Sequence, residues 1–294
     1  MRAFQYLAPI APFAFEAPGS VRELTGLMRA YGSSAKLIAG GTDLMIELKE
    51  RLIEPKTVID LSRLRPALAG VSLKGRTVRI GALTTFSELE VNPLVAKYAE
   101  ALRVAASQVG TLQIRNLGTI GGNLATASPA ADTAPPLIAL SAKVHLLSDK
   151  GERTVPVEKF FTGVKRTVLS PYEFISAVEL PAEEGVTSHW TRFARRNENV
   201  ISVVSVAAAV ELEGGRFSHG RISLGAVAPT PLLAGRSSTA LNGSQADEET
   251  IQKIARLASS ESKPISDVRA GAEYRRHLVY VLTKRILSLL AGVD

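Results

Sequence analysis

The chain has 294 residues, 46% hydrophobic and 21% charged, which is enough for two domains with real cores and excludes a disordered chain or a disulfide-stapled miniature fold. The formal net charge is +7, but basic and acidic residues interleave and aromatic residues make up only 5%, so a nucleic-acid-binding surface is not supported. There is no cysteine, which excludes disulfides, thiol nucleophiles and any iron–sulfur cluster ligated by the chain itself, so a redox centre would be a bound organic cofactor.

The first predicted element is a helix over 20–31. Ser20 and Glu23 form a capping box at its start, and Gly32 is a stop signal at its end. Short strands and strand pairs are then expected at 36–39, 58–61, 71–73 and 78–80.

The segment 70–77 resembles a phosphate-binding loop, with Arg76 where that motif has lysine. A phosphate loop must join a strand to a helix, whereas both flanks here are strand-like, so a hairpin turn is expected and ATP binding is not. A hydrolase nucleophile motif is also missing, and the four histidines are too far apart for metal-ligand spacing.

The middle of the chain contains the least ordinary segment, 118–132, which is poor in charge and rich in small residues. One long alanine-rich helix is expected before it, over 94–109 and ending at Gly110. Asp132 is expected to cap a short helix over 134–140.

The last part of the chain predicts strands followed by helices, which is typical of an α+β fold. Composition changes near 181–185, where we place a domain boundary. The expected elements are strands at 144–147, 173–180, 189–193, 200–212 and 221–227, and helices at 246–259 and 271–290. In the last helix an apolar stripe is expected to pack on the sheet, formed by Leu278, Leu282, Ile286 and Leu289.

Two glycine pairs are the main functional lead. Gly40 and Gly41 follow a strand, and Gly121 and Gly122 follow a helix and a turn. Each pair offers backbone N–H groups beside a small polar side chain. If the two turns fold together, their amides would neutralise a diphosphate without lysine. The glycine pairs alone therefore leave two interpretations open, a dinucleotide-binding site and two unrelated turns.

At these residues the sequence resembles the FAD-binding subunit of the molybdenum hydroxylases, the family of xanthine dehydrogenase, carbon monoxide dehydrogenase and aldehyde oxidoreductases. The resemblance covers essentially the whole chain. The stretches that carry it are KLIAGGTDLMIELK at 36–49, VIDLSRL at 58–64, IRNLGTIGGNLATASPAADTAPPLIAL at 114–140 and ISLGAVAPTPLLA at 222–234.

The resemblance implies a two-lobed α+β FAD-binding domain of the PCMH type, as in vanillyl-alcohol oxidase, over 1–182 with the lobes split near 56. A smaller α+β C-terminal domain would follow over 183–294. The residues implied to bind FAD are Leu37, Ile38, Ala39, Gly40, Gly41, Thr42, Asp43, Leu44, Gly110, Thr119, Ile120, Gly121, Gly122, Asn123, Asp132, Leu169, Ile175 and Arg192.

The sequence departs from its relatives at Val109, where some of them carry an aromatic residue stacked on the flavin. This leaves the electron acceptor open among NAD, a quinone and oxygen. The branch of the family with an inserted cysteine-bearing loop is excluded, because the chain has no cysteine.

The resemblance implies an electron-transfer subunit that holds FAD and takes electrons from 2Fe-2S clusters in a small partner. A large partner would hold the molybdenum cofactor, and the complex would be a heterotrimer or its dimer. A cytoplasmic location without a membrane span is expected, since the longest nearly apolar run, 200–210, is too short to cross a bilayer. The alternatives are a stand-alone flavin oxidase or reductase of the same fold and a non-enzymatic interaction module.

Overall fold

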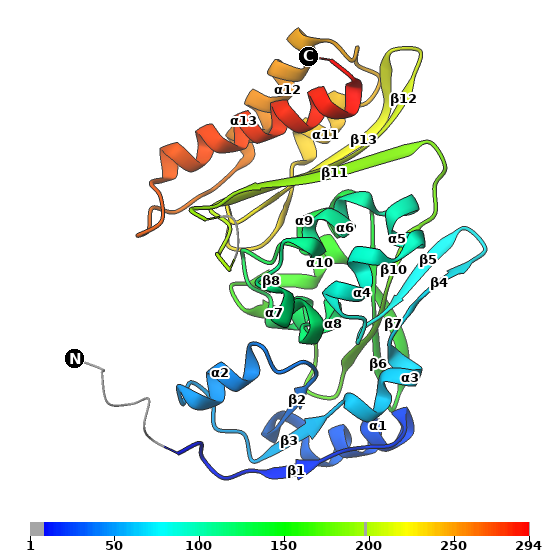
Figure 1. Ribbon diagram of the computed structural model, residues 1–294, viewed down its shortest axis with the longest axis vertical. Coiled ribbons are helices and arrows are strands. Elements are labelled where there is room, and N and C mark those ends of the chain that lie inside the picture. The colour runs from blue at the N-terminus through cyan, green and yellow to red at the C-terminus, as the bar shows by residue number, and fades with distance from the viewer. Residues whose placement is uncertain (1–8, 197–198, 294) are drawn as a thin grey trace.

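In the part of the chain that the structure describes, three larger β-sheets with their helices follow one another along the chain and along the longest axis of the molecule, and a two-stranded sheet accompanies the second of them (Figure 1). The structure is a computed structural model and describes residues 9–196 and 199–293. Helices and strands are mixed throughout, as the predicted α+β class requires. In the described residues, no helix combines the length and apolar character needed to cross a bilayer.

The first unit is a parallel sheet in the order β1-β3-β2, with strands β1 (Ala14–Glu16), β2 (Ala35–Ile38) and β3 (Thr57–Asp60). Its helices are α1 (Val21–Tyr31), α2 (Leu44–Lys49) and α3 (Arg65–Leu68), with 3₁₀ turns at Gly32–Ser34 and Ser62–Leu64. As predicted, α1 begins where Ser20 Oγ accepts the Glu23 amide and ends at Gly32, whose φ is +51°. Leu24 of α1 and Ile59 of β3 are fully buried in one core.

Gly26 lies inside α1, and no atom lies within 4 Å of the position that a Cβ would take. Because glycine costs about 0.5–1 kcal/mol relative to alanine inside a helix, we expect Gly26→Ala to raise the free energy of unfolding by about that amount. Urea unfolding followed by circular dichroism measures the difference. A loss of stability would contradict the open surroundings of this position.

The second unit is an antiparallel sheet in the order β4-β5-β10-β6-β7. Its strands are β4 (Val71–Lys74), β5 (Thr77–Gly81), β6 (Lys143–Ser148), β7 (Gly151–Pro156) and β10 (Phe174–Pro181), and a separate hairpin comprises β8 (Phe161–Gly163) and β9 (Arg166–Thr167). Its helices are α4 (Phe86–Val91), α5 (Pro93–Tyr98), α6 (Glu100–Ser107), α7 (Leu112–Leu117), α8 (Ile120–Thr126), α9 (Ala134–Ala139) and α10 (Val157–Phe160). The segment that resembles a phosphate loop is the β4–β5 hairpin, which confirms that prediction.

The two faces of the five-stranded sheet differ in character. Val78 and Val178 are fully buried in the core that β5 and β10 share with the helices. Their neighbours Arg79 and Glu179 form an ion pair at 4.0 Å, and His145 Nε2 lies 2.9 Å from Glu179 Oε2. Because strand side chains alternate between faces, α8 packs on the face that carries Val78 and Val178, and these charged side chains lie on the opposite face.

The third unit is an antiparallel sheet in the order β11-β12-β13-β14, with strands β11 (Val186–Phe193), β12 (Val204–Glu213), β13 (Arg216–Gly225) and β14 (Leu232–Leu233). Its helices are α11 (Gly235–Leu241), α12 (Glu248–Glu261) and α13 (Ala272–Ala291). The predicted strand pair and the two long helices are confirmed, whereas β14 and α11 have no counterpart among the predicted elements of this part of the chain.

Strand β12 is buried on both of its faces. Val204 and Val206 lie in the core that α12 and α13 share with the sheet, while Ala207 lies in the core of the second unit. This double burial explains why the run 200–210 is nearly continuous in apolar residues. It also makes the second and third units share one seam.

The single helix predicted over 94–109 is wrong, because two helices, α5 and α6, occupy this stretch. The backbone leaves the helical conformation at Ala99, with φ −146° and ψ 46°. Ser188 Oγ of β11 accepts the Ala101 amide at 3.1 Å and so replaces a helical acceptor. The break is imposed by packing against β11, which an alanine-rich composition cannot reveal.

The apolar stripe predicted on the last helix is only partly correct. Leu278, Leu282 and Ile286 are buried, but Leu289 is 61% exposed. Leu290 packs against the core at this end of α13. The buried stripe therefore continues from Ile286 to Leu290, four residues later on the same helix face, and Leu289 points away from the core.

Candidate functional site

The first glycine turn joins β2 to α2 and carries a run of amides without acceptors. Gly41 has φ +69°, a left-handed conformation that glycine adopts without strain. Across the ranges that the structure describes, the N–H groups of residues 40–44 donate to no acceptor in the protein, and the next amide, Met45, donates to Gly41 O at 3.0 Å. Successive amides of this kind can form an anion-binding nest, because their dipoles can converge on one group of oxygens.

The second glycine pair lies in the first turn of helix α8 and not in an open loop. Thr119 Oγ1 accepts the Gly122 amide at 3.1 Å, and the Gly121 amide donates to Ala82 O at 2.9 Å. The expectation that both pairs offer free amides is therefore wrong for this pair. A Cβ at Gly121 would lie 2.7 Å from Ala82 Cβ, so glycine here permits close packing of α8 on the sheet.

The two glycine segments lie against each other although they are far apart in the sequence. A Cβ built on Gly40 would overlap with the carbonyl oxygen of Leu117, so only glycine allows this backbone contact. Asp43 Oδ2 accepts a hydrogen bond from Thr126 Oγ1 at 3.0 Å. The predicted meeting of the two segments is confirmed, and the free amides of the first turn border the small residues of the second.

The hairpin of β8 and β9 reaches the same region. Lys165 Nζ forms an ion pair with Glu47 Oε1 of α2 at 2.7 Å, and the Lys165 amide donates to Ala127 O at 3.0 Å. These contacts join α2, the end of α8 and the hairpin around the two glycine segments.

Asp132 and Arg192 form an ion pair at the seam between the second and third units. Arg192 Nη1 lies 2.9 Å from Asp132 Oδ2, and Arg192 Nη2 donates to Gln108 O at 3.0 Å. Ser202 Oγ donates to the other oxygen, Asp132 Oδ1, at 2.6 Å. The predicted cap by Asp132 on the following helix is therefore wrong, because both carboxylate oxygens bind across the seam.

The carboxyl group of Asp132 titrates in an unusual range. Burial raises the pKa of Asp132 to about 6, against the opposing effects of the Ser202 hydrogen bond and the Arg192 charge. The side chains of Asp132 and Arg192 are only 9% and 4% exposed, so solvent screens this pair weakly.

Three other predicted residues lie around this region at different depths. Gly110 has φ +55°, and its carbonyl accepts the Asn199 amide at 3.2 Å near the seam. Ile175 is buried on β10, next to Ser176, whose carbonyl accepts the Ala82 amide close to α8. Leu169 packs against the core of the second unit, and in the described residues its hydrogen bonds do not reach the glycine segments.

The remaining predicted residues belong to the two glycine segments themselves. Leu37 and Ala39 pack against the core of the first unit, and Ile120 is fully buried in the core of the second. Asn123 Oδ1 accepts a hydrogen bond from Thr133 Oγ1 at 2.6 Å. The second segment is thereby connected to the residue that follows Asp132.

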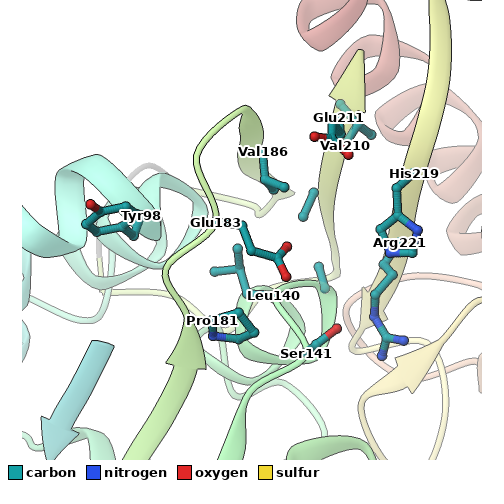
Figure 2. Close-up of a pocket in the computed structure, with 12 residues that line it drawn as sticks. Tyr98, Leu140, Ser141, Pro181, Glu183, Val186, Val210, Glu211, His219 and Arg221 are labelled. Carbon is teal, nitrogen blue, oxygen red and sulfur yellow. The ribbon is translucent and has the colours of Figure 1, made fainter. Parts of the chain in front are cut away.

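A pocket elsewhere on the seam is distinct from this region. Figure 2 shows Glu183, His219 and Arg221 lining it, and none of the predicted cofactor-binding residues belongs to its lining. Arg221 is held by Glu158 at 2.6 Å and by Ile138 O. In the described residues, no cluster of three or more His, Asp or Glu side chains is arranged to hold a metal ion.

Three residues that make contacts in the candidate site were not predicted from the sequence. Thr126 and Lys165 carry no local signal, because their roles arise from contacts with α2. Ser202 does have a signal, since it is one of two serines within the apolar run 200–210. Ser202 is buried just before β12, and its hydroxyl finds its hydrogen-bond partner in Asp132.

Comparisons with known proteins match the chain over nearly its whole length. Residues 11–183 match the family model described as "FAD binding domain in molybdopterin dehydrogenase", and residues 189–290 match "CO dehydrogenase flavoprotein C-terminal domain". The xanthine dehydrogenase FAD-binding subunit of Escherichia coli O157:H7 is 33% identical over 262 residues, which are 88% of this chain and 89% of that protein.

Two further matches concern carbon monoxide dehydrogenase from Hydrogenophaga pseudoflava. Its medium chain is 34% identical over 276 residues, which are 94% of this chain and 96% of the relative. A solved structure of that enzyme matches with a TM-score of 0.91 at 35% identity and covers 95% of this chain and 98% of its own. The chain, with its FAD-binding domain and C-terminal domain, therefore belongs to the flavoprotein subunits of the molybdenum hydroxylase family.

Proposed function

We propose that this chain is the electron-transfer subunit of a molybdenum-containing hydroxylase complex. It would receive electrons from iron–sulfur clusters of a small partner and deliver them to an external acceptor, beside a large partner that holds the molybdenum cofactor. Bound FAD supplies the chemistry of this exchange, because it accepts and releases both single electrons and pairs. The medium-chain relatives support an assembly of this kind, which we propose to be a heterotrimer or its dimer.

The observation that carries the proposal is the run of free amides over residues 40–44. A diphosphate is a doubly charged anion with several acceptor oxygens, and these donors have no competing acceptor in the described protein. The donor set therefore fits the cofactor. The chain's own work would be to bind and orient FAD through this turn, and to exclude water where α2, α7 and α8 meet.

We assign the binding residues as the family resemblance implies, with one refinement from the hydrogen bonds. Residues 37–44 would hold the diphosphate and the ribityl chain, and 119–123 would form the opposite wall. Gly121 and Gly122 would act through their small size, since their amides are already bonded. The residues proposed nearer the ring are Gly110, Asp132, Leu169, Ile175 and Arg192.

Val109 stands where some relatives have an aromatic residue stacked on the flavin, and it packs against the core of the second unit. We therefore propose that backbone and aliphatic contacts enclose the ring on this side. For the domains, we propose 1–182, with lobes split near 56, and 183–294. We propose the cytoplasm as the location, which suits a chain without cysteine.

The purified full chain is expected to retain about one FAD per chain, because the nest binds the diphosphate without help from a partner. The measurement is the flavin absorption spectrum together with identification of the cofactor released by heat. Native co-purification is expected to bring iron and molybdenum with the flavin. Flavin without either metal, combined with substrate turnover by the isolated chain, would favour a stand-alone flavin enzyme and contradict the proposal.

A further inference from the structure

A chain of buried polar contacts leads from the second glycine segment to the seam. Asn123 of α8 accepts the Thr133 hydroxyl at 2.6 Å, and the residue before Thr133 is Asp132. Asp132 binds Arg192 of β11 at 2.9 Å, and Arg192 binds Gln108 O at 3.0 Å, two residues before Gly110. The buried ion pair thus lies between the two places where the chain is proposed to approach the cofactor.

The described neighbours of this ion pair come from α6, the segment before β12 and α13. From α6 it meets the carbonyl of Gln108, and α9 carries no ionisable residue. Val203, the residue after Ser202, accepts a hydrogen bond from Arg275 of α13 at 2.8 Å, and Arg275 is itself paired with Asp267 at 2.7 Å. Asp132, which precedes α9, places a carboxylate directly against the Arg192 guanidinium.

We propose that Asp132 is a positioning residue: it holds the Arg192 guanidinium at the seam and places a negative charge beside it, so that protonation of one buried carboxyl group changes the charge next to the bound flavin. This inference rests on the proposed function. It assigns Asp132 a role through Arg192, and not as a direct ligand of FAD.

The electrostatic consequence has a definite sign. When Asp132 is ionised, the pair is neutral, and when Asp132 is protonated, the pair carries the positive charge of Arg192. A positive charge favours reduction of a nearby flavin, because the reduced form is the more negative one. Burial raises the pKa of Asp132 to about 6, so the change falls between about pH 5 and pH 7.

The test is a redox titration of the FAD-loaded full chain between pH 5 and 8.5. The wild type is compared with Asp132→Asn, which removes the negative charge. At pH 8 the variant is expected to have the higher flavin midpoint potential, and at pH 5 the two potentials are expected to coincide. The wild-type curve should therefore show a break near pH 6 that the variant lacks.

Ser202→Ala supplies an independent arm that keeps both charges. It removes the hydrogen bond to Asp132 Oδ1, so the carboxylate is less stabilised and the break should move up by about one pH unit. Ser205→Ala is the matched control. Ser205 is also buried, pairs directly with Arg192 across β11 and β12, and has no hydrogen-bond partner in the described residues, so its loss should leave the break unmoved.

The outcomes separate the inference from the proposed function. Equal potentials of wild type and Asp132→Asn at every pH, or a difference that does not vary with pH, would overturn the inference. If Asp132→Asn fails to hold flavin, the serine variants decide, and a Ser202→Ala break at the wild-type pH overturns it. A wild-type chain that holds no FAD contradicts the proposed function itself.

Discussion

Gly40→Ala is expected to weaken FAD binding by about 100-fold or more. The added Cβ overlaps with the carbonyl oxygen of Leu117, so the two glycine segments must move apart. Loss of two hydrogen bonds from residues 40–44 to a charged phosphate would cost about 1.5–3 kcal/mol each, and about 1.4 kcal/mol corresponds to a tenfold change in affinity. Titration of the apoprotein with FAD, followed by flavin fluorescence, measures the effect.

Gly26→Ala is the matched control for this experiment, because it makes the same chemical change where a Cβ meets open space. It should bind FAD like the wild type. Circular dichroism of both variants checks that the chain is folded. A folded Gly40→Ala protein that binds FAD with wild-type affinity would show that contact between the two turns is not needed for the cofactor.

The sequence predicted correctly those features that depend only on neighbouring residues, such as helix caps and tight turns. The capping box at Ser20, the stop at Gly32 and the hairpin turn around Gly75 are all present, since each depends on residues within a few positions of one another. The two glycine pairs also led to the right region. Their contact at Gly40 became visible only in the fold, because it joins backbone atoms of distant segments.

The errors concern groups whose partners come from elsewhere in the chain. The amide of Gly121 is bonded because β5 continues into Ala82, and the helix over 94–109 breaks at Ala99 where Ser188 takes the next free amide. Asp132 looked like a helix cap, yet its partners are far away in sequence. No pattern of neighbouring residues encodes these pairings, which arise when the sheets and helices pack.

Arg275→Met is expected to destabilise the protein by about 3–5 kcal/mol, a large part of the stability of a typical domain. Arg275 is 4% exposed and donates to Val203 O at 2.8 Å, to Ala226 O at 3.1 Å and to Asp267 at 2.7 Å. Methionine fills a similar volume but leaves these acceptors without a donor. Urea unfolding at pH 7 measures the loss, and Arg276→Met, at an exposed position, should change stability by less than about 0.5 kcal/mol.

The pH dependence of this loss identifies its origin. Burial opposes ionisation of Asp267, but the amides of Arg269 and Ala270 and the Arg275 guanidinium outweigh it and lower the pKa of Asp267 to about 2. A lowered carboxyl pKa contributes stability above the ordinary value near 4, and this contribution is lost as the pH falls from about 4 to about 2. Without Arg275 the pKa of Asp267 rises toward its ordinary value, so the stability difference between wild type and Arg275→Met should shrink over the same range. A difference that stays constant from pH 7 to pH 2.5 would assign the loss to the buried carbonyls of Val203 and Ala226 alone.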